Sequence, residues 1–233
     1  MIIALNNKCN LTKPEFITYQ KELTHLSTTA TLILCPSSLY LGEIAPSSIK
    51  LGAQNVSSTE CGAYTGEISA SQLKSASVKY CIVGHSERRA NQHETDDEIA
   101  KKIKLLLKEE IIPILCVGED KTKRQENLQL QVIMEELKMA MKNLSMEEQK
   151  KVIIAYEPIW SIGTGIIPTN NQIEEVINAI KKLYPENQVL YGGSANEENI
   201  DELKNISCID GYLIGGLSLK PEKLKIFLEK LEN

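Results

Sequence analysis

Residues 80–117 read YCIVGHSERRANQHETDDEIAKKIKLLLKEEIIPILCV and contain one complete strand–helix–strand unit. Two short apolar runs, Tyr80–Val83 and Ile112–Val117, enclose a segment with helical periodicity. The apolar side chains of that segment share one helical face: Ile99, Ile103, Leu106 and Leu107. The opposite face is charged and faces water: Lys101, Lys104, Lys108 and Glu109. Because two parallel strands need a long crossover between them, the stretch predicts a parallel unit with a connecting helix.

The same alternation of short apolar runs and helical stretches recurs along the whole chain. It predicts eight strands: Ile2–Asn6, Thr31–Cys35, Leu51–Asn55, Tyr80–Val83, Ile112–Val117, Val152–Tyr156, Gln188–Tyr191 and Gly211–Ile214. Three helices are predicted to start with a capping box, in which paired side chains satisfy free backbone N–H groups: Thr12 with Glu15, Thr95 with Glu98, and Thr169 with Gln172. Eight such units favour an α/β fold, a closed (β/α)8 barrel over residues 1–233 as one domain, with a doubly wound open sheet as the alternative.

Composition excludes several classes of protein. The net charge of −5 argues against nucleic acid as the main partner, and no apolar stretch is long enough to cross a membrane. The first residues lack the pattern of a secretory leader, and the six cysteines contain no C-x-x-C pair, which favours reduced thiols in the cytoplasm. No nucleotide-binding glycine motif occurs, and no metal-ligand spacing is present, so neither a cofactor nor a metal is expected.

Polar and glycine residues follow the predicted strands, and in a barrel these positions meet at one rim. Glu157 directly follows the apolar run 152–156 and precedes Pro158. Partial burial there would strengthen its carboxylate as a base, although a carboxylate at a strand end is also common on surfaces. Residues 158–165, PIWSIGTG, hold the only tryptophan of the chain, Trp160, and are typical of a loop that closes over a site.

Two further residues at this rim fit acid–base chemistry. His85 opens the segment GHSERR, where a short helix starting near Ser86 would disfavour the imidazolium, so that a neutral ring could donate a hydrogen bond to a substrate oxygen. A purely structural histidine is the alternative. Lys8 lies just beyond the first strand and offers a positive charge to an enolate or a phosphate. A solvated lysine and a Schiff-base lysine are the alternatives.

Glycine pairs follow the last two strands. Gly192-Gly193-Ser194 and Gly215-Gly216 lie where barrels often bind a phosphate between backbone N–H groups, and Gly163 in the 158–165 loop would add another. A single glycine pair is weak support because tight turns use glycine for steric reasons alone. Two pairs at corresponding strand ends are more specific. The rim therefore predicts proton transfer on a small phosphorylated sugar.

Eight motifs in order make the chain resemble the triose-phosphate isomerase family over nearly its whole length. They are NNKCN from Asn6, GAQN from Gly52, GAYTGEIS from Gly62, GHSERR from Gly84, CVGE from Cys116, AYEPIWSIGTG from Ala155, YGGS from Tyr191 and IGGLSL from Ile214. The resemblance implies a TIM barrel and a cofactor-independent isomerase of glycolysis and gluconeogenesis. Its reaction would interconvert dihydroxyacetone phosphate and D-glyceraldehyde 3-phosphate through an enediolate. A glutamate base, a neutral histidine and a water-excluding loop are established roles in this family.

The resemblance also implies roles for individual residues. Glu157 would be the base, His85 the electrophile, and Lys8 and Asn6 substrate-binding residues. Backbone groups of Gly163, Ser194, Gly215 and Gly216 would bind the phosphate, with Glu87 and Cys116 in supporting places. A homodimer is implied as well, with three residues assigned to its loop contacts: Gln54, Thr65 and Glu67. A mobile surface loop is the alternative for the segment around Gly62 to Glu67.

Four positions depart from the family pattern: Asn7 replaces tryptophan, Cys9 methionine, Ala195 valine and Leu217 alanine. The first three reduce apolar volume, so we expect a barrel core somewhat less stable than is usual in the family. Two other readings stay open on the residues alone, another phosphosugar barrel enzyme such as an aldolase or an epimerase, and an inactive barrel that serves as a binding protein.

Overall fold

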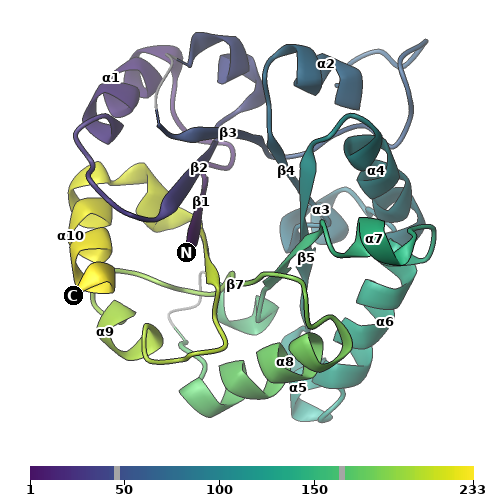
Figure 1. Ribbon diagram of the computed structural model, residues 1–233, viewed down its shortest axis with the longest axis vertical. Helices are drawn as coiled ribbons and strands as arrows, with labels where there is room; N and C mark the ends of the chain where they lie inside the picture. Colours follow the sequence, from purple (N-terminus) through teal and green to yellow (C-terminus); the bar gives the residue numbers. More distant parts are fainter. Residues whose placement is uncertain (45–47, 163–165) are drawn as a thin grey trace.

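The computed structural model describes residues 1–44, 48–162 and 166–233, and these form a closed barrel of strands surrounded by helices (Figure 1). Eight strands lie in the described part of the chain: β1 (Ile2–Asn6), β2 (Thr31–Cys35), β3 (Lys50–Ala53), β4 (Tyr80–Val83), β5 (Ile112–Val117), β6 (Ile153–Tyr156), β7 (Val189–Tyr191) and β8 (Gly211–Ile214). All neighbouring pairs are parallel, and they follow one another in sequence order.

The first and last strands close the barrel. Ile2 of β1 is paired with Thr31 of β2 on one side and with Gly211 of β8 on the other. A Cβ atom at Gly211 would lie 2.0 Å from the carbonyl oxygen of Ile2, so the seam requires glycine there. The (β/α)8 prediction is therefore confirmed, and the open-sheet alternative is wrong.

Helices cover the outside of the barrel. They are α1 (Lys13–Leu23), α2 (Ala70–Ser75), α3 (Ser86–Asn91), α4 (Asp96–Lys108), α5 (Lys121–Gln125), α6 (Gln129–Met141), α7 (Met146–Gln149), α8 (Asn170–Leu183), α9 (Ile200–Leu203) and α10 (Pro221–Glu232). Short 3-10 turns occur at η1 (Ser38–Glu43), η2 (Ile159–Ser161) and η3 (Gly216–Leu219). The three predicted capping boxes are present at the starts of α1, α4 and α8.

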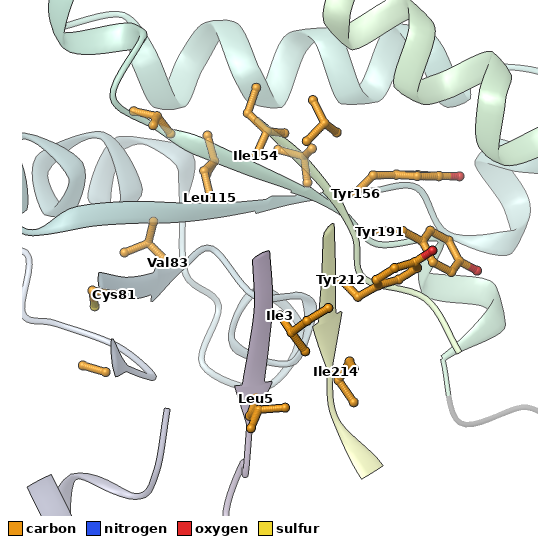
Figure 2. Packing of buried hydrophobic residues seen from close by; sticks show 14 of the residues in the cluster. Ile3, Leu5, Cys81, Val83, Leu115, Ile154, Tyr156, Tyr191, Tyr212 and Ile214 are labelled. Atoms are coloured by element: carbon orange, nitrogen blue, oxygen red, sulfur yellow. The ribbon is translucent and has the colours of Figure 1, made fainter. Parts of the chain in front are cut away.

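Alternation along the strands divides the core into two layers. In β6, for example, Ile154 and Tyr156 belong to the layer between strands and helices, whereas Ile153 and Ala155 belong to a cluster made of strand residues, which fills the barrel. Figure 2 shows part of the outer layer, with the rings of Tyr191 and Tyr212 side by side. This alternation decides which residues at the strand ends point into the barrel mouth.

The strand boundaries differ from the prediction mainly at β3. The predicted strand extended to Asn55, but the ladder ends at Ala53. The side chain of Gln54 turns to the rim instead and donates hydrogen bonds to the carbonyl oxygens of Lys8 and Cys35, both at 2.9 Å. Strands β6 and β7 each begin one residue later than predicted, which is within the usual uncertainty of strand ends.

Candidate active site

Glu157 lies at the centre of the rim. It is the first residue after β6 and, by alternation from Ala155, its side chain turns into the barrel mouth, where it is only 2% exposed. Its backbone N–H donates to the carbonyl oxygen of Val117 at 2.8 Å, which extends the β5–β6 ladder. A Cβ atom at the neighbouring Gly118 would lie 1.7 Å from the carbonyl oxygen of Glu157, so this close approach depends on glycine.

His85 and Glu157 are in direct contact. Nε2 of His85 lies 3.0 Å from Oε1 of Glu157, and the backbone N–H of Ser86 donates to Oε2 at 3.0 Å. The short helix predicted near Ser86 is present as α3, and His85 is its N-cap residue. Nδ1 of His85 accepts a hydrogen bond from the backbone N–H of Glu87 at 3.2 Å. Because that bond uses the lone pair on Nδ1, the ring proton belongs on Nε2, facing Glu157.

Burial and charge act in opposite directions on this pair. Burial raises the pKa of Glu157, but the contact with His85 and the N–H of Ser86 outweigh it, and the pKa is lowered. Burial lowers the pKa of His85, but the Glu157 carboxylate outweighs it, and the pKa is raised. This direction is opposite to the one expected from the helix N-terminus alone, because that expectation did not include a carboxylate in contact with the ring. The lowered pKa favours the carboxylate form of Glu157.

Lys8 reaches the same mouth from the end of β1. Its backbone has a φ of 52°, a strained conformation for lysine, and its N–H donates to Oδ1 of Asn6 at 3.0 Å. Nζ lies 2.5 Å from Oε1 of Glu87, which follows His85 closely in sequence. A Cβ atom at Gly215 would lie 3.1 Å from Cε of Lys8. Lys8 therefore lies between the His85 segment and the turn after β8.

The two glycine turns lie at the same rim. The turn at Gly215 follows β8 and leads into η3, beside Lys8 as described above. The turn at Gly192 follows β7, and its N–H donates to the carbonyl oxygen of Tyr156 at 2.8 Å, next to Glu157. Ser194 Oγ donates to the carbonyl oxygen of Ser161 at 3.1 Å, which connects this turn to η2. Gly163, the remaining expected phosphate-binding residue, lies outside the described residues.

The family comparison agrees with this geometry. The family model described as triosephosphate isomerase matches residues 1–231. The chain belongs to the triosephosphate isomerase family. A triosephosphate isomerase of Clostridium botulinum (strain Langeland) is 41% identical over 236 residues, which cover 95% of each chain. A triosephosphate isomerase of Emericella nidulans is 40% identical over 219 residues, covering 89% of this chain and 88% of the relative. The resemblance seen in the sequence is confirmed, and the chain is an enzyme of the isomerase class.

The sequence assigned no role to Glu119, the last residue of the CVGE motif that this chain shares with the triosephosphate isomerase pattern. Glu119 is fully buried, and its Oε1 accepts hydrogen bonds from Nε1 of Trp160 at 2.8 Å and from the hydroxyl of Tyr156 at 3.2 Å. Burial raises the pKa of Glu119, and the bond from Trp160 partly opposes the shift. The tryptophan of the 158–165 loop is therefore anchored to the end of β5. A charged residue two positions beyond the end of an apolar strand was the available signal.

A second set of residues missed by sequence reasoning supports the site from behind. Arg89 donates from Nε to the carbonyl oxygen of Gly84 at 2.8 Å and pairs with Asp96 at 2.6 Å. Glu136 of α6 accepts the N–H of Gly118 at 3.0 Å and lies 3.7 Å from Arg89. These contacts join the ends of β4 and β5, and Glu157 bonds to both ends through Ser86 and Val117. Burial raises the pKa of Glu136 to about 7.

Cys116 lies inside the barrel at the end of β5, beside Ala155 in the β5–β6 ladder. Burial, followed by the negative charge of Glu157, raises the pKa of its thiol well above the ordinary value. The thiol is therefore uncharged and packs as a small apolar side chain near Glu157. In the described part of the chain, no group of three or more acidic, histidine or cysteine side chains has an arrangement that would hold a metal ion.

The residues expected in dimer contacts are divided between a loop and the rim. Thr65 and Glu67 are exposed in the segment 54–69 between β3 and α2, whereas Gln54 is half-buried and bonded to Lys8 as described above. A cavity of about 560 Å³ opens beside this segment and is lined by Lys8, His85 and Glu87 among other residues. The empty space therefore reaches Lys8 and His85, two of the three catalytic side chains expected for the triosephosphate isomerase family. No described helix combines the length and apolarity needed to cross a membrane.

Proposed function

We propose that this chain interconverts dihydroxyacetone phosphate and D-glyceraldehyde 3-phosphate in glycolysis and gluconeogenesis, as a single barrel domain over residues 1–233. The observation that carries the proposal is the contact between His85 and Glu157, with 3.0 Å between Nε2 and Oε1, at a rim shared with Lys8. The printed name of the relatives supports the choice of a triose phosphate among small phosphorylated sugars.

The reaction uses one base and one hydrogen-bond donor. The Glu157 carboxylate removes a proton from C1 of dihydroxyacetone phosphate, and the electron pair of the broken C–H bond forms the C1–C2 double bond of an enediolate. The Nε2–H of a neutral His85 stabilises the negative charge that develops on O2 and moves a proton between O1 and O2. Glu157 then returns its proton to C2, which gives the aldehyde. Substrate entry separates His85 from Glu157, so the charge that raises the pKa of the free histidine is moved away from the ring.

Charge and phosphate are handled by other residues. The Lys8 ammonium stabilises the enediolate oxygen, with Glu87 as its carboxylate partner at 2.5 Å and Asn6 holding its backbone. Backbone N–H groups bind the phosphate in our proposal: those of Gly163, Ser194, Gly215 and Gly216. Their glycine turns allow close approach to an anion. Cys116 fills space behind the base. None of these steps needs a cofactor.

The working form proposed is a cytoplasmic homodimer. The cavity next to Lys8 and His85 has the volume to accept a loop tip such as the one around Thr65 from a second copy. An inserted loop would exclude water from the Lys8 side of the site, which strengthens the electrostatic contacts there.

A coupled assay with D-glyceraldehyde 3-phosphate tests the function directly, run with and without a chelator and compared with His85→Gln. We expect turnover that the chelator leaves unchanged and that the substitution lowers by about 10²-fold or more. Loss of activity with the chelator would favour a metal-dependent epimerase. Imine trapping at Lys8 with borohydride would favour an aldolase, although Lys8 is an ammonium paired with Glu87 and an imine requires a neutral amine.

A further inference from the structure

Asn7 is a buried polar side chain that the proposed reaction does not use. It follows β1, and by alternation its side chain points outward from the barrel, between α1 and η3. Nδ2 donates to the hydroxyl of Tyr19 at 3.1 Å and to Oγ of Ser218 at 3.2 Å. Oδ1 has no hydrogen-bond partner among the described residues. A buried amide oxygen without a partner lowers stability, so we expect asparagine at this position to have a role that compensates for the loss.

Ser218 connects this amide to the turn after β8. Its backbone N–H donates to the carbonyl oxygen of Gly215 at 2.8 Å, and its Oγ donates to the carbonyl oxygen of Asn6 at 3.2 Å. Ser218 is fully buried, so both bonds are shielded from water. The Asn7–Ser218 pair therefore joins the end of β1 to the Gly215-Gly216 turn, across 211 residues of sequence.

Lys8 is the next residue after Asn7 and points the opposite way, into the mouth. Its Cε lies 3.1 Å from the place that a Cβ atom of Gly215 would occupy. Its left-handed backbone is held by Asn6 on one side, and Gln54 bonds its carbonyl oxygen on the other. Any shift of Asn7 relative to Ser218 therefore changes the position of the Lys8 ammonium relative to the Gly215 N–H groups.

We propose that Asn7 and Ser218 are positioning residues that set the spacing between Lys8 and the Gly215-Gly216 turn. Through this spacing they determine how strongly the enzyme prefers a phosphorylated sugar to the same sugar without phosphate. The inference rests on the proposed function, in which Lys8 binds the sugar oxygens and the turn binds the phosphate. The two ends of the substrate are then held by two elements that Ser218 connects through buried hydrogen bonds to Asn7 and to the carbonyl oxygen of Asn6.

The test uses Asn7→Leu and Ser218→Ala, each with a measured thermal midpoint. Leucine has the same number of side-chain heavy atoms, branched at the same carbon, and it removes the amide together with its unpartnered oxygen. For each variant we would measure KM and kcat with D-glyceraldehyde 3-phosphate, the inhibition constant of inorganic phosphate, and kcat/KM for D-glyceraldehyde. We expect KM for the phosphorylated sugar and the phosphate inhibition constant to rise about fivefold to tenfold. The value for D-glyceraldehyde should stay at the wild-type level.

Tyr19→Phe is the matched control. It removes the other acceptor of the same amide, on the α1 side, without touching the Gly215 turn. It should lower the thermal midpoint and leave unchanged both KM for D-glyceraldehyde 3-phosphate and the inhibition constant of inorganic phosphate. The inference would be overturned if kcat/KM fell equally for D-glyceraldehyde 3-phosphate and D-glyceraldehyde. It would also be overturned if Tyr19→Phe raised the phosphate inhibition constant as much as Ser218→Ala does. If Asn7→Leu proves insoluble, Ser218→Ala decides alone.

The same data separate this inference from the proposed function. A wild-type chain that neither turns over the phosphorylated sugar nor is inhibited by phosphate would contradict the proposed function. A wild-type chain with both properties, whose two variants keep the wild-type constants, would contradict only the positioning role. In the double variant the two effects on the phosphate inhibition constant should add only in part, because both substitutions break the Asn7–Ser218 bond and Ser218→Ala also removes the bond to the carbonyl oxygen of Asn6.

Discussion

Nε2 of His85 and Oε1 of Glu157 lie 3.0 Å apart at the mouth of the barrel. The two groups proposed to handle protons are thus each other's partners. In the proposed reaction, the substrate replaces this contact: its oxygen accepts from His85 and its carbon-bound proton faces Glu157. The proposal therefore predicts that binding of the substrate breaks one hydrogen bond, between His85 and Glu157.

Shortening the base tests this alignment. Glu157→Asp moves the carboxylate back by one methylene, so we expect kcat to fall by about a hundredfold or more while KM changes little. Steady-state kinetics in the coupled assay measure both constants. Glu126→Asp makes the same chemical change on the exposed surface and should keep wild-type kinetics. A fully active Glu157→Asp variant would rule out Glu157 as the base.

Glu136 should give stability a distinct pH dependence. Burial raises its pKa to about 7 from an ordinary 4.5, so the folded protein binds more protons than the unfolded chain between these values. Stability contributed at this residue is complete below about pH 4.5 and falls as the pH rises through about 7.

Glu136→Gln removes this titration and can still accept the N–H of Gly118. Urea unfolding at pH 5 and at pH 8 should show the variant gaining free energy of unfolding relative to wild type at the higher pH. Loss of the ionic partner of Arg89 offsets part of the gain at pH 8. The idea is wrong if the difference between the two proteins is the same at both pH values.

Trp160 should contribute to stability through Glu119. Trp160→Phe keeps an aromatic ring but removes the donor to a fully buried carboxylate, so we expect the free energy of unfolding to fall by about 1–3 kcal/mol. Thermal or urea unfolding measures the change. An unchanged stability would mean that solvent or another donor replaces the indole at Glu119.

The loop around Thr65 should control association. We expect the wild-type chain to sediment as a dimer, and Thr65→Asp to yield monomers at micromolar concentration because a desolvated carboxylate opposes insertion into the cavity beside Lys8. Asn178→Asp places the same acid on the exposed face of α8, across the barrel from α2 (Figure 1), and should remain dimeric. A dimeric Thr65→Asp protein would remove this loop from the interface.

Much of the fold followed from local pattern. Strands such as Tyr80–Val83 and helices with capping boxes, such as the one begun by Thr95, are encoded by periodicity and by side chains three residues apart. The rim position of Glu157 followed as well, because it depends only on a strand ending where it does. Gln54 was different. Its side chain bonds to the carbonyl oxygens of Lys8 and Cys35 beyond the end of β3, and no pattern in the neighbouring sequence predicts these bonds.

The supporting contacts were beyond the reach of sequence reasoning because each joins distant segments. Glu136 lies on a helix face and supports the site only through the N–H of Gly118. Asn7 was interpreted as lost apolar volume, whereas the structure gives it two hydrogen bonds and one unpartnered oxygen. The expected lower stability remains a prediction, now with the unpartnered oxygen as a physical cause. A thermal midpoint unaffected by Asn7→Trp would count against it.

The seam between β1 and β8 has a consequence for how the enzyme is made. A ribosome releases the β1 end, with Lys8 attached, well before the β8 end with its glycine turn. Until then both edges of a growing parallel sheet stay open, and open edges pair with other chains. A chain that lacks β8 therefore has an incomplete site and two unpaired strand edges that can aggregate. Synthesis of β8 both closes the rim that holds Lys8 and pairs the last open edges of the sheet.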